Sequence, residues 1–191
     1  APVIAAWTPT CTAEDYRVAV GRIRDYIARG DTYQVNFTHR LHARFAGDPW
    51  VFFLRLARAQ CPAYAAWLDL GDDVICSASP ELFVARRGAM LTCRPMKGTA
   101  PRGLTAAADD ARAAWLHASE KNRAENVMIV DMIRHDLGRV ARTGSVQVAQ
   151  LFAVERYDTL WQLTSTVTAE SGVGLPELMA AGIPVAIETR Y

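Results

Sequence analysis

Apolar side chains recur every three or four residues between Thr12 and Gly30. An acidic residue stands three positions after Thr12. Thr12 suits the N-cap of a capping box, and Gly30 suits the left-handed residue that ends a helix. We therefore expect a helix between them. Capping residues, prolines and helical spacing predict further helices over 50–60 (largely buried, after Asp48-Pro49), within 106–119, over about 120–137, and from Pro176.

Other stretches alternate apolar and polar residues with the period of two that is typical of a strand. Residues 33–40 alternate in this way, with Gln34 on the polar side. Two pairs of such segments are joined by short glycine-containing turns and predict hairpins, so we expect largely antiparallel sheets. Two later segments, 145–155 and 160–170, also predict strands. Residues 95–104 are rich in Pro and Gly and predict a loop, and the tail 181–191 has no usable pattern.

The order of these elements predicts an α+β fold with flanking helices, in one domain over residues 1–191. Hydrophobic residues make up 51% of the 191 residues and the formal net charge is +1, so no strong field favours a nucleic acid or an anionic membrane. No apolar run is long enough to span a bilayer. The four cysteines form no C-x-x-C pair, and we expect idle thiols in a reducing cytoplasm.

Lys97 is a candidate nucleophile in the Pro- and Gly-rich segment. A lysine reacts as a nucleophile only when its amine is uncharged, which burial or neighbouring cations favour, and Arg94 and Arg102 lie close in sequence. Gly98 lets the backbone approach a ligand, and Thr99 offers a hydroxyl. The alternative interpretation is a solvated lysine on a surface loop.

Three further polar residues each have two interpretations. Glu125 lies on a mostly apolar helix face, where it is either a Mg²⁺ ligand or the partner of Lys121 in a surface pair. Glu81, after Ser79-Pro80, is either a general acid or a solvated side chain at the start of a strand. Gln34 belongs to a strand face that is either functional or in contact with solvent.

Several motifs together resemble the chorismate-utilising enzymes. The motifs occur in the family's order and span about 150 residues, which makes the resemblance very specific. They are GDTYQVNFTHR (30–40), SPELF (79–83), PMKGTAPRG (95–103), KNRAENVMIVDMIRHDLGRV (121–140), GSV (144–146) and LTSTV (163–167). The resemblance covers about 14–170 and leaves the tail 171–191 uncertain.

The resemblance implies an α/β sandwich with antiparallel sheets and a Mg²⁺-dependent site. Isochorismate-forming members carry a lysine base where Gln34 stands, and anthranilate-forming members carry alanine where Lys97 stands. Lysine in K-G-T resembles the branch that aminates chorismate with ammonia to 4-amino-4-deoxychorismate, on the way to p-aminobenzoate and folate. Ammonia would come from a glutamine amidotransferase subunit.

Roles for the matching residues follow from the same resemblance. Lys97 would attack the substrate ring and Glu81 would protonate the departing hydroxyl, while Glu125 would be a Mg²⁺ ligand. The resemblance places five residues near the substrate in binding or supporting roles: Gln34, Thr99, Arg134, Arg139 and Gln162.

The sequence departs from the family at three places. The S-I-T-G-A-P-K segment that follows LTSTV in the family is absent, so we expect the chain to be the central part of a larger enzyme. His135 stands where asparagine is usual, and Gln162 stands where many members have histidine. Two alternatives therefore stay open: an anthranilate-forming component, and a catalytically inactive truncated chorismate-binding fragment.

Overall fold

The structure is a computed structural model that describes residues 2–181. The residues group by their contacts into two compact units. The first unit holds the residues up to Cys61 together with Ala65–Ala78, and the second holds Pro62–Tyr64 and the described residues from Ser79 onward. The expectation of one domain over residues 1–191 stays a prediction.

The first unit contains two helices, α1 (Ala13–Arg29) and α2 (Pro49–Gln60), and both confirm the sequence prediction. Thr12 and Asp15 form the capping box of α1, and Gly30 ends that helix at φ 79°. The expectation that α2 is largely buried was wrong, because Phe53 is its only buried residue. Its aromatic side chains instead pack on one another at a partly exposed surface.

The strands of the first unit are short and paired two by two. Strand β1 pairs with β4 and β2 with β3, both antiparallel, and β5 pairs with β6. These strands are β1 (Val3–Ile4), β2 (Thr8–Pro9), β3 (Leu41–His42), β4 (Phe45–Ala46), β5 (Tyr64–Asp69) and β6 (Val74–Ser79).

The predicted strand over residues 33–40 was wrong. Regular pairing begins only at Leu41, and the preceding residues run as irregular chain, where Phe37 packs against Tyr16 at a ring distance of 5.5 Å. An alternating pattern says which side chains face inward, but a strand also needs a neighbour that receives its hydrogen bonds. In this segment such a neighbour is found at the last residue, where the Arg40 carbonyl accepts from the N–H of Thr10 at 2.9 Å.

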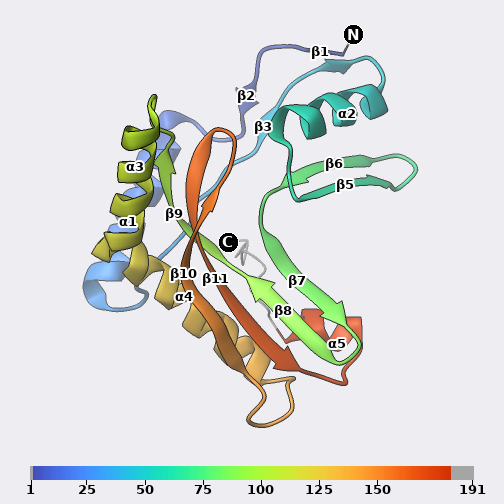
Figure 1. The fold of residues 1–191 in the computed structure, drawn as a ribbon. Helices are drawn as coiled ribbons and strands as arrows, with labels where there is room; N and C mark the ends of the chain where they lie inside the picture. Colours follow the sequence, from blue (N-terminus) through green and yellow to red (C-terminus); the bar gives the residue numbers. More distant parts are fainter. Residues whose placement is uncertain (1, 182–191) are drawn as a thin grey trace. The chain divides into compact units, whose positions relative to one another are not determined.

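The second unit is a five-stranded antiparallel sheet with helices on one side (Figure 1). Four strands follow the order β10–β11–β8–β7, and β9 also pairs with β11, so the prediction of largely antiparallel sheets is confirmed. The strands are β7 (Leu82–Arg87), β8 (Met90–Arg94), β9 (Met96–Pro101), β10 (Gln147–Arg156) and β11 (Leu160–Glu170). The helices are α3 (Ala106–Ala118), α4 (Glu120–Gly138) and α5 (Leu175–Ala180).

Most of residues 95–104 form strand β9 and not the loop that their prolines and glycines predicted. Strand β9 pairs with β11 from Leu160↔Pro101 to Thr164↔Met96. Prolines are tolerated here because they stand just before the strand and at its last residue, where a missing N–H costs little. The candidate nucleophile is therefore part of a sheet.

Strand β11 separates the two faces of this sheet. Its odd-numbered residues from Leu163 to Ala169 are fully buried and face α3 and α4, while its even-numbered residues carry polar side chains on the opposite face. The apolar core between sheet and helices consists of Leu91, Cys93, Val130, Ile133, Leu137, Val167, Ala169 and Leu178. Burial also raises the pKa of the Cys93 thiol to about 12, which makes this cysteine inert.

Candidate active site

Lys97 lies in a bulge of strand β9. Met96 pairs with Thr164 and Thr99 with Gln162, so Lys97 and Gly98 together oppose the single residue Leu163. The Lys97 side chain is half-buried. Among the described residues, no carboxylate lies within ion-pair distance of its ammonium group. The lysine is thus neither on an exposed loop nor neutralised by a counter-ion.

Gly98 makes this bulge possible. Its φ is +104°, a conformation that side chains disfavour, and a Cβ placed there would lie 3.0 Å from the Cβ of Asn122 on α4. The helix therefore presses directly against the backbone beside Lys97. Glycine at this position allows both the bulge and the close approach of α4.

Thr99 and Gln162 lie together on the polar face of the sheet. They are cross-strand partners, and the Thr99 hydroxyl donates a hydrogen bond of 3.2 Å to Oε1 of Gln162. Glu155 on β10 is the partner of Gln162 on its other side. Directly opposite residues on adjacent strands point to the same face. We call these three residues (Thr99, Gln162 and Glu155) the polar row.

Glu81 also reaches the strand of Lys97. Its carboxylate accepts a hydrogen bond of 3.0 Å from the backbone N–H of Met96, one residue before the lysine. The Ser79 hydroxyl accepts from the Glu81 N–H at 3.2 Å, which fixes the turn that leads into β7. Glu81 itself is exposed, as expected for the solvated side chain that was one of its two interpretations. The structure thus links Glu81 to the backbone of β9 next to Lys97, and Thr99 to Gln162 across β9 and β11.

The positive surround that was expected from Arg94 and Arg102 is absent, because each guanidinium is paired with a carboxylate. Arg94 forms an ion pair with Glu155. Burial lowers the pKa of Arg94, but Glu155 outweighs this effect and raises it. Arg102 pairs with Asp109 at the far end of β9, and its hydrogen bonds hold the pKa of Asp109 well below its usual value. Sequence proximity revealed the cations but not their partners.

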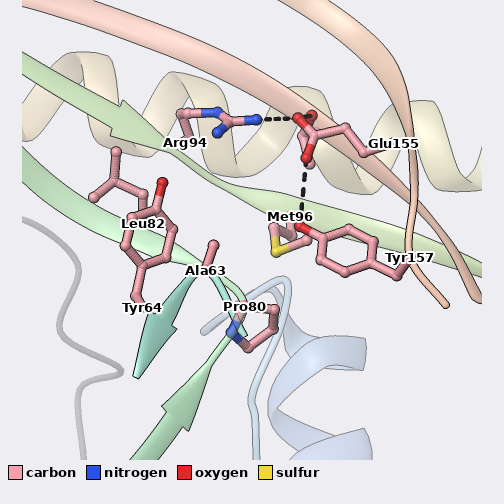
Figure 2. A pocket seen from close by; sticks show the side chains of 9 residues that line it. Ala63, Tyr64, Pro80, Leu82, Arg94, Met96, Glu155 and Tyr157 are labelled. Carbon is pink, nitrogen blue, oxygen red and sulfur yellow. Dashed lines mark hydrogen bonds and ion pairs between the residues drawn. The ribbon is translucent and has the colours of Figure 1, made fainter. Parts of the chain in front are cut away.

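A cavity of about 80 Å³ lies beside the polar row (Figure 2). Figure 2 shows the Arg94 guanidinium directed at the Glu155 carboxylate, and the Tyr157 hydroxyl donates to the same carboxylate at 3.4 Å. The Thr164 hydroxyl donates to it at 2.8 Å. Burial, and next the Glu155 charge, raise the pKa of Tyr157. Glu155 is thus the centre of the polar contacts here, and the sequence interpretation had assigned it no role.

Glu125 forms the surface pair that was one of its two interpretations. Its Oε1 lies 3.8 Å from Nζ of Lys121, and its side chain is 43% exposed. The neighbouring Asn126 is the fully buried residue that faces the sheet. Within residues 2–181, no group of three acidic, histidine or cysteine side chains is placed to hold a metal ion. The described residues therefore do not make a complete metal site by themselves.

The other candidate residues have contacts that do not involve the polar row. Arg134 forms an ion pair of 2.8 Å with Asp131. It stands twelve positions after Asn122 on α4, which corresponds to about 18 Å along the helix axis. Arg139, further along, donates to the carbonyl of Ala181 at 3.1 Å. Gln34 lies half-buried in the first unit. Their substrate-binding roles stay predictions.

An antiparallel sheet with helices on one face, the polar row on the other and a bulged lysine in strand β9 defines an α+β unit that carries candidate residues of an enzyme. The sequence matches the family of chorismate binding enzymes over residues 1–186, and the chain belongs to this family. The resemblance that the motifs indicated is therefore confirmed.

Three similar proteins show how far the likeness extends. Aminodeoxychorismate synthase component 1 of Escherichia coli (strain K12) is 42% identical over 175 residues, covering 92% of this chain and 38% of that protein. Anthranilate synthase component 1 1 of Haloarcula marismortui is 38% identical over 182 residues, covering 94% and 37%. The crystal structure of anthranilate synthase component I from Streptococcus pneumoniae TIGR4 has a TM-score of 0.84 at 30% identity, covering 96% and 40%. The chain spans about two fifths of the length of the curated relatives it matches.

Proposed function

We propose that this chain is the central part of an aminodeoxychorismate synthase component 1, which aminates chorismate with ammonia to 4-amino-4-deoxychorismate. The observation that supports this proposal is the half-buried Lys97, whose bulge lies between Met96, the backbone partner of Glu81, and Thr99, the partner of Gln162. Relatives named for amination are 40–42% identical to the chain, and those named for anthranilate synthesis are 35–38% identical.

The chemistry explains why a lysine is useful. Replacing the 4-hydroxyl by nitrogen with retention needs two displacements, and a covalent adduct supplies the first. The uncharged Lys97 amine would bond to C2 as the C4–O bond breaks, and Glu81 would give its proton to the departing oxygen, which leaves as water. Ammonia would then bond to C4 as the C2–N bond breaks, and its surplus proton would return to Glu81.

Thr99 and Gln162 would contact the substrate, since both polar groups lie on the face that also carries Glu155. We further propose that Glu125 contributes one oxygen ligand to Mg²⁺, whose charge would help to hold the ring carboxylate. Its other ligands would have to come from outside the described residues. Gln34, Arg134 and Arg139 would have supporting roles.

A glutamine amidotransferase subunit is proposed as the source of ammonia, because the amination relatives are named as component 1. A cytoplasmic location is proposed from the four cysteines, which lie unbridged in the structure. Among the described residues, none of the helices has both the length and the apolar content needed to cross a membrane.

The test is the product formed by the complete polypeptide that carries this segment, with chorismate, ammonia and Mg²⁺. We expect 4-amino-4-deoxychorismate, and we expect Lys97→Ala and Lys97→Arg to abolish it, because neither side chain can form the adduct. Arg112→Ala, an exposed change on α3, is the matched control and should leave the rate unchanged. Wild-type product from Lys97→Ala would disprove the nucleophile. Anthranilate as the product of the unaltered protein would support an anthranilate-forming component. No binding of chorismate in calorimetry would support an inactive fragment.

A further inference from the structure

A buried hydrogen-bond network lies on the other face of β11, directly behind the polar row. Ser165 and Asn126 are both fully buried, and the Ser165 hydroxyl donates to Oδ1 of Asn126 at 2.5 Å. The Asn126 amide donates to the carbonyl of Leu163 at 3.2 Å. Two polar side chains are thus placed at positions where helix and strand otherwise bury apolar groups. Such groups are costly to bury unless each is paired, and here each is.

The same serine holds a bulge in the neighbouring strand. Gln150 pairs with Thr166 and Ala153 with Thr164, so Leu151 and Phe152 oppose the single residue Ser165. Phe152 has φ 58°, an unusual conformation for a side chain of this size. Its backbone N–H donates to the Ser165 hydroxyl at 3.2 Å and thus has the partner that the interrupted ladder does not supply.

The bulge decides which way Glu155 points. Side chains alternate along a strand, so one extra residue reverses the face of every residue that follows. With the bulge, Glu155 is the partner of Gln162 and shares the polar face with Arg94. Without it, Glu155 would turn toward the helices and leave Arg94 unpaired beside the strand of Lys97.

We propose that Asn126 and Ser165 are positioning residues, which lock the Phe152 bulge and thereby place Glu155 in the polar row with Gln162 and Thr99. Asn126 also fixes the rotation of α4, which carries Glu125 at the preceding position. The proposal deepens the proposed function, and it rests on that function only for its catalytic consequence.

The structural arm of the test measures amide hydrogen exchange and cross-strand contacts by NMR. In Ser165→Ala, we expect the Phe152 amide to exchange at least tenfold faster, and the contacts between Glu155 and Gln162 to weaken. Thr168→Ala removes a hydroxyl from the polar face of the same strand and should change neither signal. Unchanged exchange at Phe152 in Ser165→Ala would overturn the proposal, whatever the activity of the protein.

The catalytic arm separates positioning from stability. The double variant Ser165→Ala with Asn126→Leu replaces both polar partners by apolar groups and should regain most of the stability that Ser165→Ala loses. The Phe152 N–H remains without its acceptor, so kcat should stay at least tenfold low, while Ser165→Thr, which keeps the hydroxyl, should recover it. Full kcat in the stable double variant would overturn the proposal. An inactive wild-type protein would instead disprove the proposed function and leave the NMR arm to decide.

Discussion

Strand β9 ends in a closed ionic cluster at Pro101 and in an open bulge at Met96. At the first end, the Asp109 carboxylate accepts from Nε of Arg102 at 2.8 Å, from the N–H of Gly103 at 2.9 Å and from Nε1 of Trp161 at 2.8 Å. Arg102 also donates to the carbonyl of Tyr157 at 2.7 Å and lies 5.1 Å from the centre of the Trp161 ring. Arg102 and Asp109 therefore neutralise one another at this end.

The other end of the strand is arranged differently. Lys97 has a half-buried side chain and no ion-pair partner among the described residues, and Gly98 beside it has a positive φ. The proposed nucleophile thus lies at the end of the strand where no carboxylate pairs with it among the described residues, while the ion pair at the other end fixes the strand. The four experiments below test this division.

The largest effect is expected from Gly103→Ala. A Cβ at Gly103 would overlap the backbone of Ala108 and Asp109 at the start of α3, so helix and strand would have to separate. We expect a loss of more than about 3 kcal/mol in the free energy of unfolding, from chemical denaturation. Gly138→Ala has open space around the new methyl and should change stability by at most about 1 kcal/mol. Equal losses in the two variants would contradict the closed packing at this end.

Acid should weaken the paired end through Asp109. Its folded-state pKa lies below the ordinary value of 3.8, so its charge stabilises the fold above that pH, and this contribution is lost as the pH falls toward the folded-state pKa. We expect the melting temperature of Asp109→Asn to be lower than that of the wild type at pH 6, and the gap to narrow below about pH 4. The measurement is thermal unfolding from pH 6 to pH 2. A gap that does not change with pH would show that the charge contributes nothing.

Gly98→Ala should have a smaller effect on stability and a large one on activity. The positive φ and the contact with Asn122 predict a loss of about 1–2 kcal/mol in the free energy of unfolding. Because the bulge carries Lys97, we also expect amination to fall at least tenfold. Gly172→Ala, with nothing near its new methyl, is the control. Full activity in Gly98→Ala would show that the bulge does not position the lysine.

The smallest effect on stability is expected from Lys97→Ala, the variant proposed above to abolish the product. The amine makes no ion pair among the described residues, so the free energy of unfolding should change by about 0.5 kcal/mol or less. Chemical denaturation measures the free energy of unfolding, and the product assay measures amination, on one sample of the variant. A loss comparable to that of Gly103→Ala would mean that Lys97 is a structural residue.

Local patterns predicted the helices well, because their signals lie within a few residues of one another. Thr12 with Asp15, Gly30 and Asp48-Pro49 marked helix ends that the structure confirms. The hairpin of β7 and β8 and the strands β10 and β11 were also predicted, since alternation and turns are local too. The predictions failed at 33–40 and 95–104, where the presence of a strand depends on a neighbour that is distant in sequence.

The candidate site divides in the same way. The motifs identified Lys97, Glu81, Thr99 and Gln162 as candidates. In the structure, the strand of Lys97 also contains Thr99, which pairs with Gln162, and Met96, whose N–H binds Glu81. The pattern gave no sign that Glu155 pairs with Arg94 or Asp109 with Arg102, because the partners lie on different elements. In the strand 160–170, Ser165 stands at a position where the alternation would place an apolar residue. This serine was the one signal in the sequence for the Asn126–Ser165 network.

The sequence by itself determined the family, the helix ends and the residue types that can do the chemistry, because each of these depends on identity and short-range order. Only the tertiary structure decided which charges neutralise one another and which remain available. That outcome depends on register: a single bulge at Phe152 or at Lys97 reverses the faces of all that follows, and only pairing with another strand fixes where such a bulge occurs.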